Sequence, residues 1–219
     1  MALLDFATTI KRAKEAKLPL PKQALVRDRK QLDHACKTLT FPLAMKIISP
    51  SFVHKSDVKL VKIHLKDKTE AVHAYVELLH RARHLDAHAV IEGILMQEMV
   101  EGTELIFGIK KDPSFGPVIM VGLGGIFVEV YKDVSFRVCP ITKKDAKEML
   151  SELKGKKLLT GARGMLPADI DKIAQVMVRL SLLAMKYTDI EEIDLNPVFV
   201  QGKQIHVVDV RMLKKEVGV

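Results

Sequence analysis

The sequence predicts an α+β protein built from two lobes. Helix-like and strand-like segments are intermingled along the chain without the strict βαβ rhythm of a parallel sheet. Several strand-like runs alternate apolar and polar residues, as strands with one solvated face do. A polar, glycine-containing stretch at 97–103 follows an apolar run and is the expected boundary between lobes. We therefore expect an N-terminal lobe over about 20–97 and a C-terminal lobe over about 98–215, with residues 1–20 forming an N-terminal helix.

Five segments have the apolar periodicity of amphipathic helices. The first lies within residues 1–16. Three more are expected to begin at Asp28, Asp67 and Thr142, each of which is followed three residues later by a side chain suited to a capping box. The longest begins near Asp169, and the methionines in its apolar stripe indicate a core-facing side.

Eight runs of apolar and β-branched residues are expected to be strands. They are bounded by turn-forming or charged residues, which fixes their approximate ends. The eight runs are 43–48, 58–65, 90–97, 105–109, 118–121, 136–138, 198–200 and 204–210.

The composition is that of a globular protein that does not cross a membrane. The chain has 219 residues, of which 48% are hydrophobic and 28% charged, so it can bury a substantial core. No apolar run is long enough to span a bilayer, and the charged residues within 1–16 exclude a signal peptide. Two cysteines without motif spacing give no disulfide framework. A cytoplasmic location is the resulting expectation.

The net charge of +8 allows two kinds of anionic partner. Basic residues are concentrated in the first forty positions, which could attract nucleic acid. However, the chain has no tryptophan and does not interleave basic with aromatic residues, as base-stacking surfaces do. A solvated basic face, or affinity for small molecules that carry phosphate, is the favoured interpretation. We expect no nucleic-acid partner.

A carboxylate and an amide close to the C-terminus suggest a divalent metal site. Asn196 ends one short strand-like segment and Asp209 lies in the next, with a turn at Gln201–Lys203 between them. Such a hairpin can bring the two side chains together at one end of a sheet. Their oxygens suit Mg²⁺, which keeps waters and phosphate oxygens as further ligands. The alternative is a surface hairpin with an incidental aspartate.

Lys46 and His54 are candidates from the N-terminal half. Lys46 lies inside an apolar strand run, so its ammonium must either meet an anion such as phosphate or reach solvent along the strand. His54 lies in the polar turn His54–Asp57 and is a nucleophile, a proton carrier or an ordinary loop residue.

The expected lobe boundary and the segments after it supply further candidates. Glu98 and Glu104 flank the boundary, where backbone groups could meet an adenine edge and a carboxylate the ribose hydroxyls. The glycines of 122–130 would let the backbone approach phosphates, although the spacing matches no standard phosphate-binding motif. Arg137 could form a fork on phosphate oxygens.

Together these segments resemble the β subunit of ADP-forming acetyl-CoA (acyl-CoA) synthetases, an ATP-grasp domain related to the β subunit of succinyl-CoA synthetase. The resemblance covers about residues 15–211, and the stretch from Asp112 to Arg137 is its most specific part. The matching segments, in order, are 41–46 with 49–50, 54–57, 97–99, 112–117, 122–130, 132–137, 161–164 and 194–197.

The resemblance implies an ATP-grasp fold whose two lobes close on Mg²⁺ and ADP or ATP. It also implies a reversible reaction in which acyl-CoA, ADP and phosphate give acid, CoA and ATP. A CoA-binding α subunit would be the partner, in an α2β2 heterotetramer. His54 would relay a phosphoryl group between that partner and ADP. A nucleotide-sensing module of a larger assembly, without catalysis, is the alternative.

The resemblance also assigns binding roles. Lys46 would neutralise nucleotide phosphates, Glu98 and Met99 would meet adenine, and Glu104 the ribose. Asn196 and Asp209 would hold Mg²⁺, with Asp194 as an orienting or additional charge. Arg137 and Arg163 would face phosphates or the α subunit. One departure is Lys59–Leu60, which stands where related proteins often have two glycines.

Overall fold

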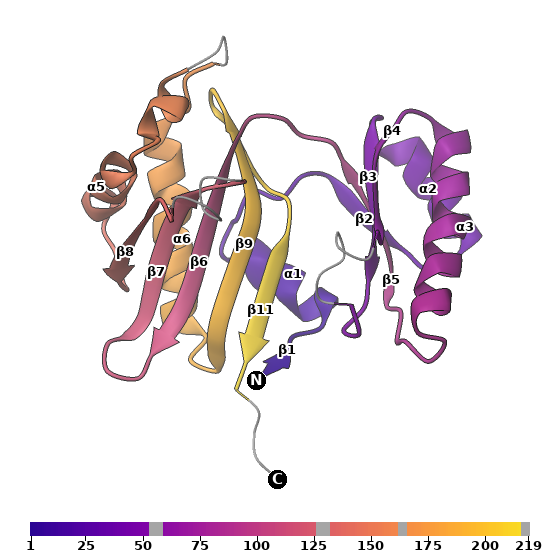
Figure 1. The fold of residues 1–219 in the computed structure, drawn as a ribbon, viewed down its shortest axis with the longest axis horizontal. Helices are drawn as coiled ribbons and strands as arrows, with labels where there is room; N and C mark the ends of the chain where they lie inside the picture. Colours follow the sequence, from indigo (N-terminus) through magenta and orange to yellow (C-terminus); the bar gives the residue numbers. More distant parts are fainter. Residues whose placement is uncertain (53–58, 126–131, 162–165, 216–219) are drawn as a thin grey trace. The chain divides into compact units, whose positions relative to one another are not determined.

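The computed structural model describes residues 1–52, 59–125, 132–161 and 166–215. The chain divides into two compact units, each with its own sheet (Figure 1). Unit 1 consists of Met1–Leu20 and Glu101–Val219, and unit 2 consists of Pro21–Val100.

Unit 2 is a four-stranded antiparallel sheet with helices on one face. The helices are α2 (Arg29–Thr38) and α3 (Lys68–Leu85), which Figure 1 shows lying along the same side of the sheet. In spatial order the strands are β2 (Gln23–Val26), β5 (Gly93–Glu98), β3 (Leu43–Ile48) and β4 (Val61–Leu65).

Strand alternation gives the unit 2 sheet two different faces. Leu43, Met45 and Ile47 of β3 belong to the core beneath the helices. Because successive side chains point to opposite faces, Lys46 lies on the other side. We call the face opposite the helices the distal face of each unit.

Unit 1 contains a seven-stranded antiparallel sheet. It also contains the described helices that follow Leu85 in the sequence. Strand β10 (Gln204–Val207) pairs with β9 only. In spatial order the other strands are β1 (Ala2–Leu3), β11 (Val210–Lys214), β9 (Ile190–Gln201), β6 (Thr103–Asp112), β7 (Gly116–Leu123) and β8 (Val134–Val138).

The helices of unit 1 pack on one face of this sheet. They are α1 (Phe6–Glu15), α5 (Lys143–Glu152) and α6 (Ile170–Lys186), with the short 3-10 helix η1 (Lys156–Thr160) between the last two. All three α-helices contribute buried apolar side chains to a single core with the sheet. The N-terminal helix is therefore part of unit 1, and a fork from Arg12 to Asp189, with nitrogen–oxygen distances of 3.2 and 3.0 Å, fixes it there.

The five predicted helices are confirmed, and their first turns explain why they begin where they do. Asp28, Asp67 and Asp169 each accept a hydrogen bond from the backbone N–H three residues later. A complete capping box forms at Thr142 and Asp145. At the boxes predicted for Asp28 and Asp67, the side chains of Gln31 and Glu70 accept a hydrogen bond from the residue before the cap instead of from the cap itself. Glu70, for example, accepts from the Lys66 N–H at 2.8 Å.

The eight predicted strand runs all overlap strands, but two boundaries differ in a way that matters for the site. The predicted run 204–210 is two strands, because β10 ends before Val208 and β11 begins after Asp209. Residues 190–201 form one continuous strand, β9, in which Asn196 is internal. Strands β1 and β2 and helix η1 were not predicted, since each is too short to show a period.

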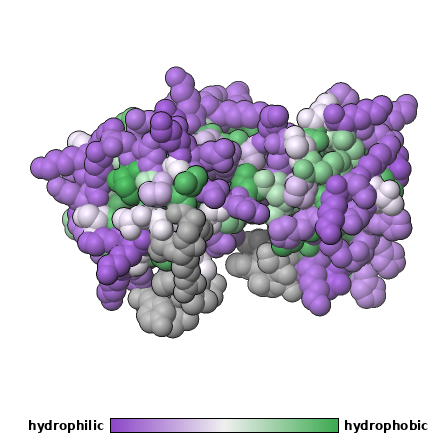
Figure 2. Space-filling model, turned by 90° about the horizontal axis from the view of Figure 1, so that it is seen from above, coloured by the Kyte–Doolittle hydropathy of each residue, from purple (hydrophilic) through white to green (hydrophobic). Residues whose placement is uncertain are grey.

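The face of the molecule that Figure 2 shows is mostly polar. Figure 2 shows hydrophilic side chains over most of the visible face, with apolar side chains gathered in small patches. Among the described residues, no helix combines the length and apolar content needed to cross a bilayer.

Candidate functional site

Asn196 of β9 lies directly opposite Asp209. The flanking residues are paired across the two strands as Leu195 with Val210 and Val198 with Val207. Both pairs belong to the same antiparallel register, so Asn196 must face Asp209 at the point where β10 stops and β11 begins. The predicted juxtaposition is therefore present, but it lies in the middle of an inner strand and not at one end of the sheet.

A bulge in β9 opens the backbone at this point. On the other side of β9, Leu105 pairs with Val198 and Phe107 pairs with Leu195, so Ile106 alone stands opposite both Asn196 and Pro197. Leu195 faces the core with 0% exposure, which directs the exposed Asn196 to the distal face.

Backbone bonds hold the facing segment in place. The Val208 N–H donates to the Pro197 carbonyl at 3.0 Å. The Val210 N–H donates to Oδ1 of Asp209 at 3.1 Å, which fixes the carboxylate against its own strand. These hydrogen bonds therefore hold the interrupted stretch between β10 and β11 in place. Asn196 and Asp209, which both have side-chain oxygen atoms, face each other there.

Asp194 adds a second carboxylate to this face. It is two residues before Asn196 on β9 and directly opposite Arg211 of β11. Burial raises the pKa of Asp194 above its ordinary value, the Arg211 guanidinium lowers it, and the charges of Asp209 and Glu192 raise it. These electrostatic effects indicate that the four charged groups share one region.

Glu104 lies on the same distal face, further along β6. Leu105, Phe107 and Ile109 face the core, so Glu104 points the other way, two residues from the Ile106 that faces Asn196. A Cβ added at Gly124 would lie 2.6 Å from Cβ of Glu104. Glycine at that position therefore lets the β7 end pack against Glu104 without a clash.

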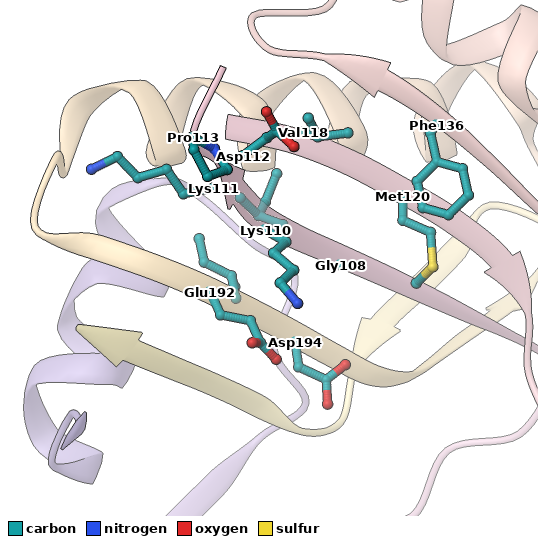
Figure 3. Close-up of a pocket in the computed structure, with 12 residues that line it drawn as sticks. Gly108, Lys110, Lys111, Asp112, Pro113, Val118, Met120, Phe136, Glu192 and Asp194 are labelled. Carbon is teal, nitrogen blue, oxygen red and sulfur yellow. The ribbon is translucent and has the colours of Figure 1, made fainter. Parts of the chain in front are cut away.

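A cavity of about 450 Å³ adjoins the charged residues on the distal face (Figure 3). One wall carries Lys110, Glu192 and Asp194, and the other carries apolar side chains that include Met120 and Phe136. Gly108 forms part of the floor between them. Asp194 thus belongs both to this cavity and to the strand that bears Asn196.

In unit 2, Lys46 lies on the distal face with only 7% of its surface exposed. It pairs with Leu95 of β5 and Val61 of β4. Gln97, 2% exposed, shares this face, and its Nε2 donates to Oε1 of Gln23 at 2.8 Å. The buried Lys46 and the amide pair formed by the buried Gln97 and the partly exposed Gln23 therefore lie on one side of the unit 2 sheet.

Glu98 points to the opposite side from Lys46. It pairs with Leu43, whose side chain belongs to the helix-covered core. Its Oε1 accepts a hydrogen bond from the Thr40 N–H at 2.8 Å, and the Lys22 ammonium lies 3.9 Å away. The carboxylate therefore anchors the chain that follows α2, and the structure does not group it with Lys46.

Backbone pairing restricts what Met99 can offer an adenine. Its N–H donates to the Pro42 carbonyl at 3.0 Å, and the Glu98 N–H donates to the Lys22 carbonyl at 3.0 Å. Pro42 has no N–H with which to return a bond to the Met99 carbonyl. The carbonyl, an acceptor, is thus the group of Met99 that remains suited to a ligand amino group.

Arg137 is held by a carboxylate of its own unit. It pairs with the fully buried Ile119 on the helix-covered face of the sheet. Its two terminal nitrogens both bond Glu152 of α5, and Nη1 also donates to the Phe136 carbonyl at 2.8 Å. The guanidinium that was predicted to bind phosphate is therefore already bonded to Glu152, and it lies on the face opposite to Asn196. We leave Arg137 out of the candidate site.

Three predicted features lie wholly or partly outside the described residues. His54 and Arg163 are among them, as is the later part of the glycine-containing stretch 122–130. Of the Lys59–Leu60 pair, Lys59 has φ of 54°, in the left-handed region that glycine adopts most easily. Leu60 is fully buried, so this position serves the core of unit 2.

The structure therefore groups Asn196, Asp209, Asp194 and Glu104 on the distal face of unit 1, and it puts Lys46 on the distal face of unit 2. Sequence reasoning missed Lys110, Gly108 and Arg211 on the first face and Gln97 on the second. The alternation of core and non-core residues in β6 and β11 could have identified the first three once the strands were known.

The oxygen donors of unit 1 fit magnesium. An amide oxygen and a carboxylate from Asn196 and Asp209 are hard ligands, and Asp194 offers a third oxygen group on the same strand. Within the described part of the chain, no three His, Cys, Asp or Glu side chains gather into a metal-binding group.

Comparison with known proteins identifies the family. The sequence matches the ATP-grasp domain family over residues 3–213. It is 42% identical over 197 residues to the acetate–CoA ligase (ADP-forming) I subunit beta of Pyrococcus furiosus, which covers 90% of this chain and 85% of that one. It is 44% identical over 198 residues to the 4-hydroxybutyrate–CoA ligase (ADP-forming) of Nitrosopumilus maritimus, but it spans only 28% of that relative's length.

Solved structures agree with the sequence comparison. A dinucleotide-forming acetyl-coenzyme A synthetase 1 of Ca. Korarchaeum cryptofilum, in complex with coenzyme A and Ca-AMPCP, matches with a TM-score of 0.93 and 40% identity, covering 98% of this chain and 94% of that one. A structure of the same enzyme with Mg-AMPPCP matches with a TM-score of 0.84 and 37% identity, covering 97% and 93%. The chain therefore belongs to the ATP-grasp family, and its close homologues there are the β subunits of ADP-forming acetate–CoA ligases.

Proposed function

We propose that this chain is the nucleotide-binding β subunit, or the corresponding part, of an ADP-forming acid–CoA ligase. The reaction is reversible: acyl-CoA, ADP and phosphate give acid, CoA and ATP. The observation that carries the proposal is that Asn196 and Asp209 face each other at the bulge of β9. The names of the homologues, which are β subunits of ADP-forming acetate–CoA ligases, support it.

The residues of unit 1 hold the metal–nucleotide complex. Asn196 and Asp209 would bind the ion, with Asp194 as an orienting or additional charge. Glu104, on the same face, accepts hydrogen bonds from the ribose hydroxyls. When bound, Mg²⁺ neutralises phosphate charge and fixes the phosphate oxygens in place.

The residues of unit 2 contribute the remaining contacts. Lys46 neutralises the phosphates from a nearly buried position, where a charge interaction is stronger than in water. The Met99 carbonyl accepts a hydrogen bond from the exocyclic amino group of adenine.

His54 carries the phosphoryl group, in a role that rests on its motif and on the resemblance. A neutral imidazole nitrogen attacks the phosphorus atom presented by the partner, so that a P–N bond forms as the bond to the partner's leaving group breaks. A β-phosphate oxygen of ADP then attacks the same phosphorus, the P–N bond breaks, and ATP forms. In the reverse direction both steps run backwards.

A CoA-binding α subunit is the partner in this proposal, in an α2β2 heterotetramer. The homologue of Pyrococcus furiosus is itself named as a β subunit. The partner would bind the acyl-CoA and form the phosphorylated species from which His54 receives its phosphoryl group. The choice of acyl group would then depend on the partner.

Labelling tests the proposal. The chain is incubated with its α subunit, acetyl-CoA and radiolabelled phosphate, and peptides are searched for an acid-labile, base-stable phosphate. We expect label on His54, no label and no ATP formation in His54→Ala, and unchanged Mg-ADP binding in that variant. His64→Ala, at an exposed position on β4, is the control and should label normally. Nucleotide binding without label on wild-type protein would favour a nucleotide-sensing module.

A further inference from the structure

Arg211 and Lys110 bring two cations to the distal face of unit 1, on either side of β9. Arg211 of β11 is directly opposite Asp194, and Lys110 of β6 is directly opposite Glu192. Directly paired residues in antiparallel strands point to the same face, so both cations share the face of Asp194. Asp209 is two residues before Arg211 and points to that face too.

The order of residues along the strands gives the face a direction. On β6, Glu104 comes first, Ile106 stands opposite the bulge that contains Asn196, Gly108 lies in the row of Asp194, and Lys110 follows. Same-face residues of a strand are about 7 Å apart. Arg211 therefore lies one step beyond the proposed metal ligands, on the side away from Glu104, and Lys110 starts two steps beyond them.

Gly108 leaves room between these charges and the apolar wall. A Cβ added there would lie 3.2 Å from the Met120 methyl carbon, closer than most side chains tolerate. Lys110 and Asp194 line the resulting cavity. Figure 3 shows the Lys110 ammonium extending to the side on which the carboxylates of Glu192 and Asp194 lie.

Neither Arg211 nor Lys110 forms an ion pair with another residue in the described part of the structure. No carboxylate there lies within 4.0 Å of either charged group, although each cation has an acidic residue as its direct cross-strand neighbour. Arginine offers a planar fork that matches phosphate oxygens, and lysine offers a mobile point charge. An anion placed over this row would meet both.

We propose that Arg211 and Lys110 form the subsite for the phosphates that follow the α-phosphate, which are the β-phosphate of ADP and the β- and γ-phosphates of ATP. The inference rests on the proposed function, because Glu104 and the Asn196–Asp209 pair set the direction in which the phosphates extend. A nucleotide whose ribose contacts Glu104 and whose metal lies at Asn196 directs the phosphates that follow its α-phosphate to the row of Arg211. There the two cations neutralise charge on the transferring group and position it.

Binding measurements test this subsite without relying on turnover. AMP, ADP and a methylene-bridged ATP analogue are titrated, each with Mg²⁺, into wild type, Arg211→Gln, Arg211→Lys, Lys110→Met and Asp209→Asn. Lys214→Gln is the matched control, because Lys214 is an exposed cation further along β11. Circular dichroism and thermal unfolding establish that each variant is folded.

We expect Arg211→Gln to weaken binding of ADP and of the ATP analogue by about 10- to 100-fold, the range for hydrogen bonds to charged groups. Lys110→Met should weaken both by about threefold. Arg211→Lys should recover part of the loss. AMP should bind every Arg211 and Lys110 variant within about twofold of wild type, because it has only the α-phosphate and does not reach this subsite.

Two results would overturn the subsite. In one, Asp209→Asn weakens ADP binding as the proposed function requires, but Arg211→Gln and Lys110→Met bind ADP like wild type. In the other, Arg211→Gln weakens AMP as much as ADP, which would make Arg211 a structural partner of Asp194. If wild type binds no Mg-nucleotide at all, the proposed function fails and the subsite falls with it.

Discussion

Lys46 and Glu98 lie on opposite faces of the unit 2 sheet, although they are on adjacent strands. Leu43, three residues before Lys46, pairs with Glu98 and faces the helices, so the odd spacing places the two charged side chains on different sides. A nucleotide that contacts Lys46 therefore does not meet the Glu98 carboxylate on the same face.

This relationship predicts the behaviour of Glu98→Ala. Loss of the bond to the Thr40 N–H should lower the free energy of unfolding by about 1 kcal/mol, as measured by urea denaturation. Mg-ADP affinity, measured by calorimetry, should stay within about twofold of wild type, because the carboxylate faces away from Lys46. A tenfold or larger loss of affinity would show instead that Glu98 contacts the nucleotide.

Glu104 should behave in the opposite way. Glu104→Gln removes a charged acceptor from the ribose hydroxyls and should weaken Mg-ADP binding by about tenfold. The matched measurement uses ADP analogues that lack one ribose hydroxyl. Wild type should bind at least one of them more weakly than ADP, and the variant should not discriminate. Equal discrimination by both proteins would remove Glu104 from the ribose.

Arg137 and Glu152 provide a pH-dependent test of a structural ion pair. Hydrogen bonds from Arg137 are the main reason that the pKa of Glu152 lies below its ordinary value. A carboxyl group with a lowered pKa in the folded state stabilises the fold at neutral pH, and this contribution is lost as pH falls through the folded-state pKa.

We therefore expect Arg137→Ala to be less stable than wild type at pH 7 and the difference to shrink as the solution is acidified below the ordinary pKa of glutamate. Urea denaturation at a series of pH values measures it. Mg-ADP affinity should be unchanged, because the guanidinium lies on the helix-covered face. A large loss of affinity, with stability unchanged, would return Arg137 to the nucleotide site.

Cys139 should be unreactive until unit 1 unfolds. Burial raises the pKa of its thiol to about 11, and the side chain belongs to the core of unit 1. At pH 8 roughly one thiol in a thousand is then ionised, and the thiolate is the reactive form. In a Cys36→Ser background, Ellman's reagent should react slowly with native protein and rapidly in urea. Rapid native reaction would mean that this part of the core opens readily.

The sequence was most informative where local chemistry decides the structure. The helix beginning at Thr142 was predictable because its capping box needs only Thr142 and Asp145. Strand β3 was predicted with its observed ends, Leu43 and Ile48, because it is a fully apolar run interrupted only by Lys46. In both cases the signal lies within a few neighbouring residues.

Pairing between strands could not be predicted in the same way. The bulge at Asn196 depends on how β9 meets β6, and the side on which Glu98 points depends on how β5 meets β3. Neither strand register can be predicted from the residues that lie close together in the sequence. The same is true of Arg211, whose place on the distal face follows from its pairing with Asp194.

The pair Asn196 and Asp209 offers the most direct test of the account. Mg-ADP is titrated into wild type, Asn196→Ala, Asp209→Asn and the double variant, with and without Mg²⁺, to complete a thermodynamic cycle. If both side chains bind one ion, each single variant should lose most of the Mg²⁺-dependent affinity and the double variant should lose little more. Additive losses, or Mg²⁺-dependent binding that survives in the double variant, would contradict the metal site.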